Sequence, residues 1–143
     1  MKGRLPVFKI RLGGKEYTID NEKEIDIDDA NLGSELVNQP TKYAWLAVLY
    51  GLAESNLEVI EEEEKQLYAE LSAGMRISSG KLTETTIKNA VLIDDRYRLM
   101  VKKRLIARKY VHILHRLVKS WEIRMQAIMA LNANEREERK QYI

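Results

Sequence analysis

The fold is decided by the stretch from Asp95 to Leu131, which reads DRYRLMVKKRLIARKYVHILHRLVKSWEIRMQAIMAL. Its apolar residues recur at steps of three, four and seven, which is the period of an α-helix. At about 100° of rotation per residue, one narrow sector holds Leu99, Ile106, Tyr110, Ile113, Leu117, Trp121 and Ile128. We therefore expect one long helix that buries this stripe against a partner.

The same helix is strongly basic. Between Arg96 and Arg124 there are ten Lys or Arg residues and a single acid, Glu122. Like charges at this density repel one another along a helix, and they suit a polyanion as partner. Contacts with a phosphate backbone would be salt-dependent and largely blind to base sequence. The residues predicted to contact phosphates are Arg98, Lys102, Arg104, Arg108, Lys109, Arg116 and Lys119.

Charge is distributed unevenly along the 143 residues. Residues 1–70 carry a net charge of −7 and residues 71–143 carry +9. This asymmetry favours a portion that faces nucleic acid, or head-to-tail attraction between subunits. The chain has no cysteine, and it has no apolar run near the roughly 20 residues of a membrane span. With no signal peptide expected at the start, we predict a soluble protein of the cytoplasm.

The N-terminal third predicts a hairpin and then a helix. VFKIRL (7–12) and KEYTID (15–20) alternate apolar and polar residues around two glycines, which is typical of a β-hairpin. Pro40 is expected to interrupt any short helix around residues 31–38, and Thr41 to cap a long helix that begins near Lys42.

The long helix is expected to run to about Ala73. Its heptad seam contains Tyr43, Leu46, Tyr50, Ala53, Leu57, Ile60, Leu67 and Leu71, and the register is unbroken if Glu64 occupies one seam position. Gly74 and the cluster Ser78–Gly80 predict the end of the helix and a turn. Thr83 is a plausible N-cap for a short helix over residues 84–92.

Together these segments predict a mainly α fold. We expect a long, coiled-coil-like antiparallel helical hairpin with a short linking helix and a small N-terminal β-hairpin, assembled as a homo-oligomer. The predicted division is a hairpin and acidic lead-in (1–40), a helical DNA-binding and oligomerisation domain (41–131) and a charged tail (132–143). The predicted core or interface anchors are Trp45, Tyr50, Leu57, Tyr110, Trp121 and Ile128.

Each candidate site also has a simpler interpretation. The basic stripe could be neutralised by Glu58 and residues 61–64 of the other helix. His112 and His115 share a helix face, but no third metal ligand is evident. The acidic run 61–64 splays its carboxylates around a helix, and Asp26, Asp28 and Asp29 lack the pattern of a calcium loop. No catalytic motif appears, so we expect neither an enzyme nor a cofactor.

Two segments share a further pattern. NLGSELVNQPTKYAWLAVLYGLAES covers residues 31–55, and KLTETTIKNAVLIDDRYRLM covers residues 81–100. The pattern is carried by Asn31, Leu32, Glu35, Leu36, Gln39, Pro40, Tyr43, Ala44 and Trp45, then by Thr83, Glu84, Ile87, Asp94 and Tyr97. In this order they resemble the UvsY-like recombination mediator proteins of bacteriophages. The resemblance covers roughly residues 31–131 and leaves out the hairpin and the tail.

The resemblance implies a function. Mediators of this type are ring-forming homo-oligomers that bind single-stranded DNA, weaken the hold of a single-strand-binding protein and load a RecA-like recombinase, without a cofactor. A phage-encoded member would act in the cytoplasm of the bacterial host. Two alternatives stay open: a structural coiled-coil scaffold or assembly chaperone of a virion, and, with less support, a peripheral membrane binder.

Overall fold

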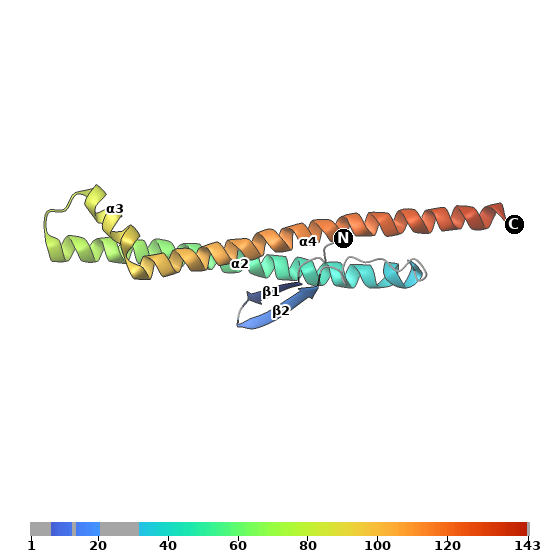
Figure 1. Ribbon diagram of the computed structural model, residues 1–143, viewed down its shortest axis with the longest axis horizontal. Coiled ribbons are helices and arrows are strands. Elements are labelled where there is room, and N and C mark those ends of the chain that lie inside the picture. The colour runs from blue at the N-terminus through green and yellow to red at the C-terminus, as the bar shows by residue number, and fades with distance from the viewer. Residues whose placement is uncertain (1–6, 13, 21–31, 143) are drawn as a thin grey trace, which may run out of the picture. The chain divides into compact units, whose positions relative to one another are not determined.

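The computed structural model describes residues 7–12, 14–20 and 32–142, except for the side chains of residues 32–34, 36 and 37 (Figure 1). The element order is β1 (Val7–Leu12), β2 (Lys15–Asp20), α2 (Leu32–Ser79), α3 (Glu84–Ile93) and α4 (Asp95–Gln141). The predicted architecture is confirmed: a long helical pair, a short linking helix and a small antiparallel hairpin. The chain divides into two compact units, unit 1 (Met1–Leu52 with His112–Ile143) and unit 2 (Ala53–Val111).

The predicted β-hairpin is confirmed, and its two strands are antiparallel. Val7 pairs with Asp20 and Leu12 pairs with Lys15, so two residues make the turn. Gly14 has a φ of 76°, a left-handed conformation that residues with a side chain rarely adopt. Because side chains alternate across a strand, one face of the hairpin carries the buried residues Ile10, Leu12 and Ile19.

Helix α2 is longer at both ends than the sequence predicts. It runs through Pro40 without a break, so the predicted interruption there is wrong. Proline removes one backbone hydrogen bond and crowds the preceding turn, but the neighbouring Gln39 is buried and hydrogen-bonded to α4, which holds the helix in place. At the other end, Gly74 lies inside the helix, and Gly80, with a φ of 71°, follows its last residue.

Helix α4 begins at Asp95 as predicted and continues to Gln141, so residues 132–141 are helical. Ion pairs between neighbouring turns support this last part: Arg139 lies 3.0 Å from Glu135, and Lys140 lies 3.4 Å from Glu137. Such pairs at a spacing of three or four residues stabilise a helix without tertiary contacts.

The predicted seam of α2 is confirmed. Leu46, Ala53, Ile60 and Leu71 are buried, and the remaining positions of the heptad pattern are partly buried. In both units the contacts between α2 and α4 join later residues of one helix to earlier residues of the other, so the pairing is antiparallel.

The predicted stripe of α4 is partly wrong. Trp121 and Ile128 are buried as expected, but Leu99 is 65% exposed and Ile106 is 52% exposed. A seam that repeats every 3.5 residues passes instead through small or charged positions such as Ala107, which is buried. The large aliphatic side chains beside these positions therefore point outward.

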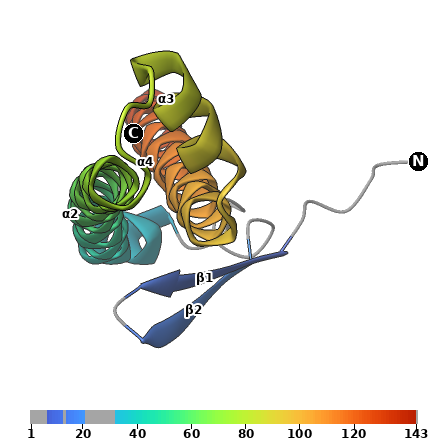
Figure 2. The same ribbon diagram turned by 90° about the vertical axis from the view of Figure 1, so that its left-hand side faces the viewer.

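In unit 2, α3 packs beside α2 and α4 (Figure 2). The hydroxyl of Thr83 accepts a hydrogen bond from the backbone N–H of Thr86, which confirms the predicted N-cap. Ile87 and Val91 lie one turn apart on α3 and form a buried cluster with Leu71 of α2. This cluster fixes the short linking helix between the two long ones.

Candidate nucleic-acid interface

Arg104, one of the predicted phosphate ligands, faces the helical partner. Its Nε lies 3.3 Å from Oε2 of Glu64, and the two side chains are 26% and 13% exposed. Glu64 occupies the seam position of α2 that the heptad pattern assigns to it, and Arg104 is the opposing residue on α4. The charge of Arg104 is therefore used within the chain, and Arg104 lies outside the candidate interface.

Two further cations of α4 lie beside acids of α2. Nη2 of Arg108 lies 3.8 Å from Oε1 of Glu61, and Nζ of Lys103 lies 3.6 Å from Oε2 of Glu63. All four side chains are about half exposed, so these pairs are weak and easily screened by salt. Arg108 is accordingly a poorer candidate for phosphate binding than the sequence predicts.

The outward side of α4 in unit 2 retains its predicted cations. Arg98, Lys102 and Lys109 are exposed, and within the described part of the chain no acid lies at ion-pair distance from them. They are interleaved with aliphatic side chains that are also exposed. The α4 outer face, as we call it, consists of Arg98, Leu99, Lys102, Leu105, Ile106 and Lys109.

In unit 1, α4 carries two of the predicted cations. Arg116 is exposed, and it lies seven residues after Lys109 in the helix, hence at the same position of the heptad. Lys119 is exposed and lies 3.7 Å from Glu122 on the next turn. A surface pair of this kind contributes little and leaves the ammonium group accessible. His115 contacts the ring of Tyr50, with the ring centres 5.5 Å apart.

A buried polar cluster in unit 1 was not foreseen from the sequence. Arg124, which is buried, donates hydrogen bonds to Gln39 and Glu35 and lies over the ring of Trp121, 4.7 Å from its centre. Gln39 in turn donates to the backbone carbonyl of Trp121 at 3.1 Å. The only available signal was that Arg124 falls three residues after Trp121, on the same side of the helix.

Two local contacts shift the ionisation of surface groups. The side chain of Arg96 donates hydrogen bonds to the carboxylate of Asp94, which lowers the pKa of Asp94 and raises that of Arg96. Tyr43 donates a hydrogen bond of 3.0 Å to Glu122, and this bond raises the pKa of the Tyr43 hydroxyl. Arg96 is therefore occupied by its own turn and does not join the candidate interface.

Tyr97, at the start of α4, is partly buried. Burial raises its pKa, and its ring meets that of Tyr68 edge-on, with centres 5.9 Å apart. It is also packed against the cluster of Leu71, Ile87 and Val91. Tyr97 is thus placed to stabilise unit 2.

The predicted anchors fall into three groups. Trp121 and Ile128 are fully buried, whereas Tyr50, Leu57 and Tyr110 are partly buried. Trp45 is 40% exposed and turns away from the seam. The structure therefore leaves Trp45 available for a contact outside the chain.

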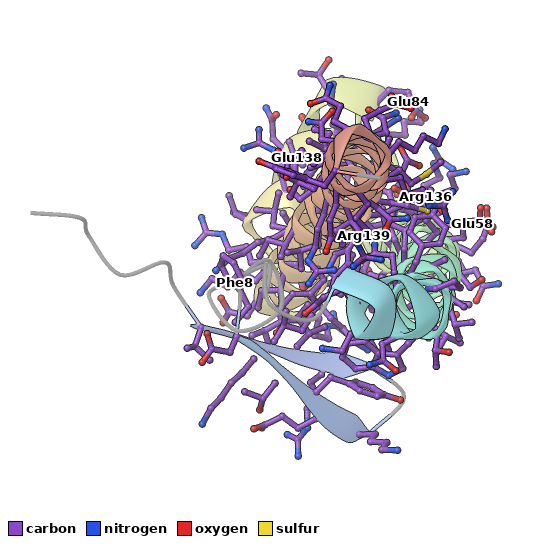
Figure 3. All side chains as sticks on the ribbon, turned by 90° about the vertical axis from the view of Figure 1, so that its right-hand side faces the viewer. Phe8, Glu58, Glu84, Arg136, Glu138 and Arg139 are labelled. Carbon is purple, nitrogen blue, oxygen red and sulfur yellow. The ribbon has the colours of Figure 1, made fainter. Side chains whose placement is uncertain are left out.

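The end of α4 carries charges of both signs. Figure 3 labels Arg136, Glu138 and Arg139, which project from its last turns in different directions. Since the turns that follow Leu131 balance their own charges through the pairs described above, this segment does not extend the basic surface.

Among the described residues, no three His, Asp or Glu side chains gather in a way that could hold a metal ion. His112 and His115 belong to this described part, whereas Asp26, Asp28 and Asp29 lie outside it. In the same part of the chain, no helix is long and apolar enough to cross a membrane.

Comparisons of the chain with protein-family models, with curated proteins and with solved structures find no match.

Proposed function

We propose that this chain binds single-stranded DNA through the outward cations of α4 and acts as a phage-type recombination mediator. The observation that carries the proposal is the exposure of cations on α4: Arg98, Lys102 and Lys109 in unit 2 and, separately, Arg116 in unit 1. The helix has no acid between Asp95 and Glu122. Arg104, which is paired with Glu64 in the seam, does not belong to the proposed contact set. Arg108 and Lys119, each at ion-pair distance from a glutamate, are weaker candidates.

Phosphate groups fit these side chains chemically. Arginine can donate two parallel hydrogen bonds to a phosphate, and lysine acts as a mobile point charge. Four such contacts release counterions, so the logarithm of the binding constant should fall with the logarithm of salt concentration with a slope of about −3 for a single strand. One copy would bind weakly, and several copies on one strand would gain affinity through avidity.

The mediator role rests on the resemblance of residues 31–55 and 81–100 to UvsY-like proteins. In this proposal the chain forms a homo-oligomer, weakens the hold of a single-strand-binding protein and promotes loading of a RecA-like recombinase in the cytoplasm of a bacterial host. No catalytic residue or cofactor is required for these steps.

A second candidate function is a structural coiled-coil scaffold without nucleic-acid binding. It is favoured by one observation, the contacts of Lys103, Arg104 and Arg108 with acids of α2, which use part of the basic stripe within the chain. The two functions differ in whether the remaining cations bind DNA.

Fluorescence anisotropy of a labelled oligonucleotide, measured over a range of salt concentrations, separates the two functions. The test variant is R98Q/K102Q/K109Q/R116Q. The matched control is K65Q/K81Q/K88Q/R136Q, which removes the same charge from exposed positions outside this face. We expect the test variant to lose most of its affinity and its salt dependence, while the control keeps both.

Equal losses in the two variants would contradict the site, since net charge alone would then explain binding. Failure of the wild type to bind at low salt would remove the DNA proposal and leave the scaffold. If DNA binds through these cations but single-strand-binding protein is not displaced and recombinase is not loaded, only the mediator role fails.

A further inference from the structure

The outward side of α2 in unit 2 is acidic. Glu58, Val59 and Glu62 are exposed there, and Val59 is 56% exposed despite its apolar side chain. Figure 3 shows Glu58 projecting from the outer side of its helix. Glu54 and Glu70 are also exposed, one turn before Glu58 and two turns after Glu62. We call Glu54, Glu58, Val59 and Glu62 the α2 outer face.

The α4 outer face combines positive charge with exposed aliphatic surface. Leu99, Leu105 and Ile106 are 65%, 51% and 52% exposed. A phosphate backbone would pair with the cations of this face but would leave these aliphatic side chains in water. Exposed aliphatic side chains that lie together mark contacts with protein surfaces, where they are removed from water.

We infer that the α4 outer face of one copy docks on the α2 outer face of a second copy. The two faces are complementary in charge: the first has three cations and no acid, and the second has three acids. Each also extends over two to three helical turns, at about 5.4 Å per turn. Val59 supplies an apolar contact for the aliphatic side chains of α4.

In the arrangement that we infer, the copies meet head to tail. The two complementary faces lie on different helices of the same unit, and the inner sides of both helices are already engaged with each other. A copy that offers its α4 outer face to one neighbour keeps its α2 outer face for another. Such heterologous contacts close into a ring or continue as a filament.

The contact also regulates the DNA site, and this consequence rests on the proposed function. Arg98, Lys102 and Lys109 would serve both the second copy and the DNA strand, so the acidic face acts as a competing polyanion. Single-stranded DNA should then displace the neighbouring copy from these cations, and high salt should weaken both contacts.

A charge exchange tests the interface without DNA. Variant A is K102E/K109E and variant B is E58K/E62K; all four positions are exposed, and of these only Glu62 has an ion pair, a surface contact with Lys65. Like charges that face each other oppose association strongly. We expect each variant alone to associate at least about tenfold more weakly than the wild type, by sedimentation, with unchanged circular dichroism.

An equimolar mixture of A and B should recover association, because the acidic faces of A then meet the basic faces of B. The control K81E/K88E, which changes the net charge as much as A but lies off both faces, should associate like the wild type. A monomeric wild type, unchanged association of A and B, or a mixture that does not recover would overturn the inference.

Binding of single-stranded DNA by the same variants separates the proposed interface from the proposed function. Variant B should bind single-stranded DNA at least as well as the wild type, because its acidic competitor is gone, whereas A should bind poorly. If the mixture recovers association but the wild type does not bind DNA, the interface stands and the proposed function fails. If DNA binds in the wild type and B binds it more weakly, the competition is refuted.

Discussion

Lys102 and Arg104 are separated by one residue of the same helix, yet they lie in opposite environments. Arg104 faces α2 and pairs with Glu64 in the seam, whereas Lys102 points outward and has no acid at ion-pair distance among the described residues. The inward cations of α4 thus belong to the fold, and the outward cations are available for a ligand. Counting basic residues cannot separate these two roles, but the direction of each side chain can.

The largest effect is expected where an inward cation is most deeply buried. Arg124→Ala would leave Glu35 and Gln39 without their common partner in unit 1. Loss of one member of a buried ion pair costs about 3–5 kcal/mol, so the free energy of unfolding should fall by this order in a urea titration. Arg136→Ala, an exposed position of the same helix, should change it by less than about 0.5 kcal/mol. A similar small effect for both would contradict the structural role of Arg124.

Arg104→Ala should have a smaller effect, because its ion pair with Glu64 is partly exposed. We expect a loss of about 1–3 kcal/mol in the free energy of unfolding, since Glu64 would remain in the seam without an opposite charge. Replacing both residues by leucine should restore most of this stability, because apolar pairs often match or exceed such ion pairs. If the double leucine variant were less stable than Arg104→Ala, the seam position of the pair would be wrong.

Most of the fold could be predicted from the sequence, but which cations of α4 point outward could not. The seam of α2 was readable because it contains an unbroken heptad pattern. The seam of α4 could not be predicted in the same way. Two of its positions are occupied by Ala107 and Arg104, whereas a heptad pattern is recognised by large apolar residues. Leu99 and Ile106 also follow the helical period, so α4 has two apolar stripes. Periodicity alone does not show which of the two stripes packs against the partner helix.

The directions of the cations could not be predicted for the same reason. A wheel of α4 places Arg104 among basic residues, and only the position of Glu64 on the other helix shows that it turns inward. Likewise, Pro40 predicted a break because local rules do not include the contacts of Gln39 with α4, which hold the helix through that point. Information of this kind lies in pairs of residues that are far apart in the sequence.

Ala107 and Ile106 allow the same comparison of an inward and an outward residue of α4 with two uncharged side chains. Ala107 is 3% exposed in the seam, so Ala107→Leu should overpack it and lower the free energy of unfolding by about 1–3 kcal/mol. Ile106 is outward, and Ile106→Ala should change stability by less than about 0.5 kcal/mol in the isolated chain. If Ile106→Ala lowered the midpoint of thermal unfolding more than Ala107→Leu, Ile106 rather than Ala107 would face α2, and α4 would be rotated about its axis.

The smallest expected effect concerns pH. Hydrogen bonds from Arg96 lower the pKa of Asp94 in the folded chain. Because the folded value lies below the unfolded one, this contact stabilises the protein above about pH 4 and is lost as the pH falls through the folded pKa. NMR titration should find the lowered pKa, and Asp94→Asn should make unfolding slightly less sensitive to acid. An ordinary pKa for Asp94 would show that the contact with Arg96 is not kept in solution.

The most direct test of the two classes of cation is the salt dependence of single-strand binding in Lys109→Gln and Arg104→Gln, measured beside their free energies of unfolding. We expect Lys109→Gln to make the slope of the logarithm of the binding constant against the logarithm of salt concentration shallower by about 0.7, with an unchanged free energy of unfolding. Arg104→Gln should instead lower stability and keep the slope of the wild type. Equal slopes for Lys109→Gln and the wild type, or an equal loss of slope in both variants, would contradict the division of the α4 cations into inward and outward classes.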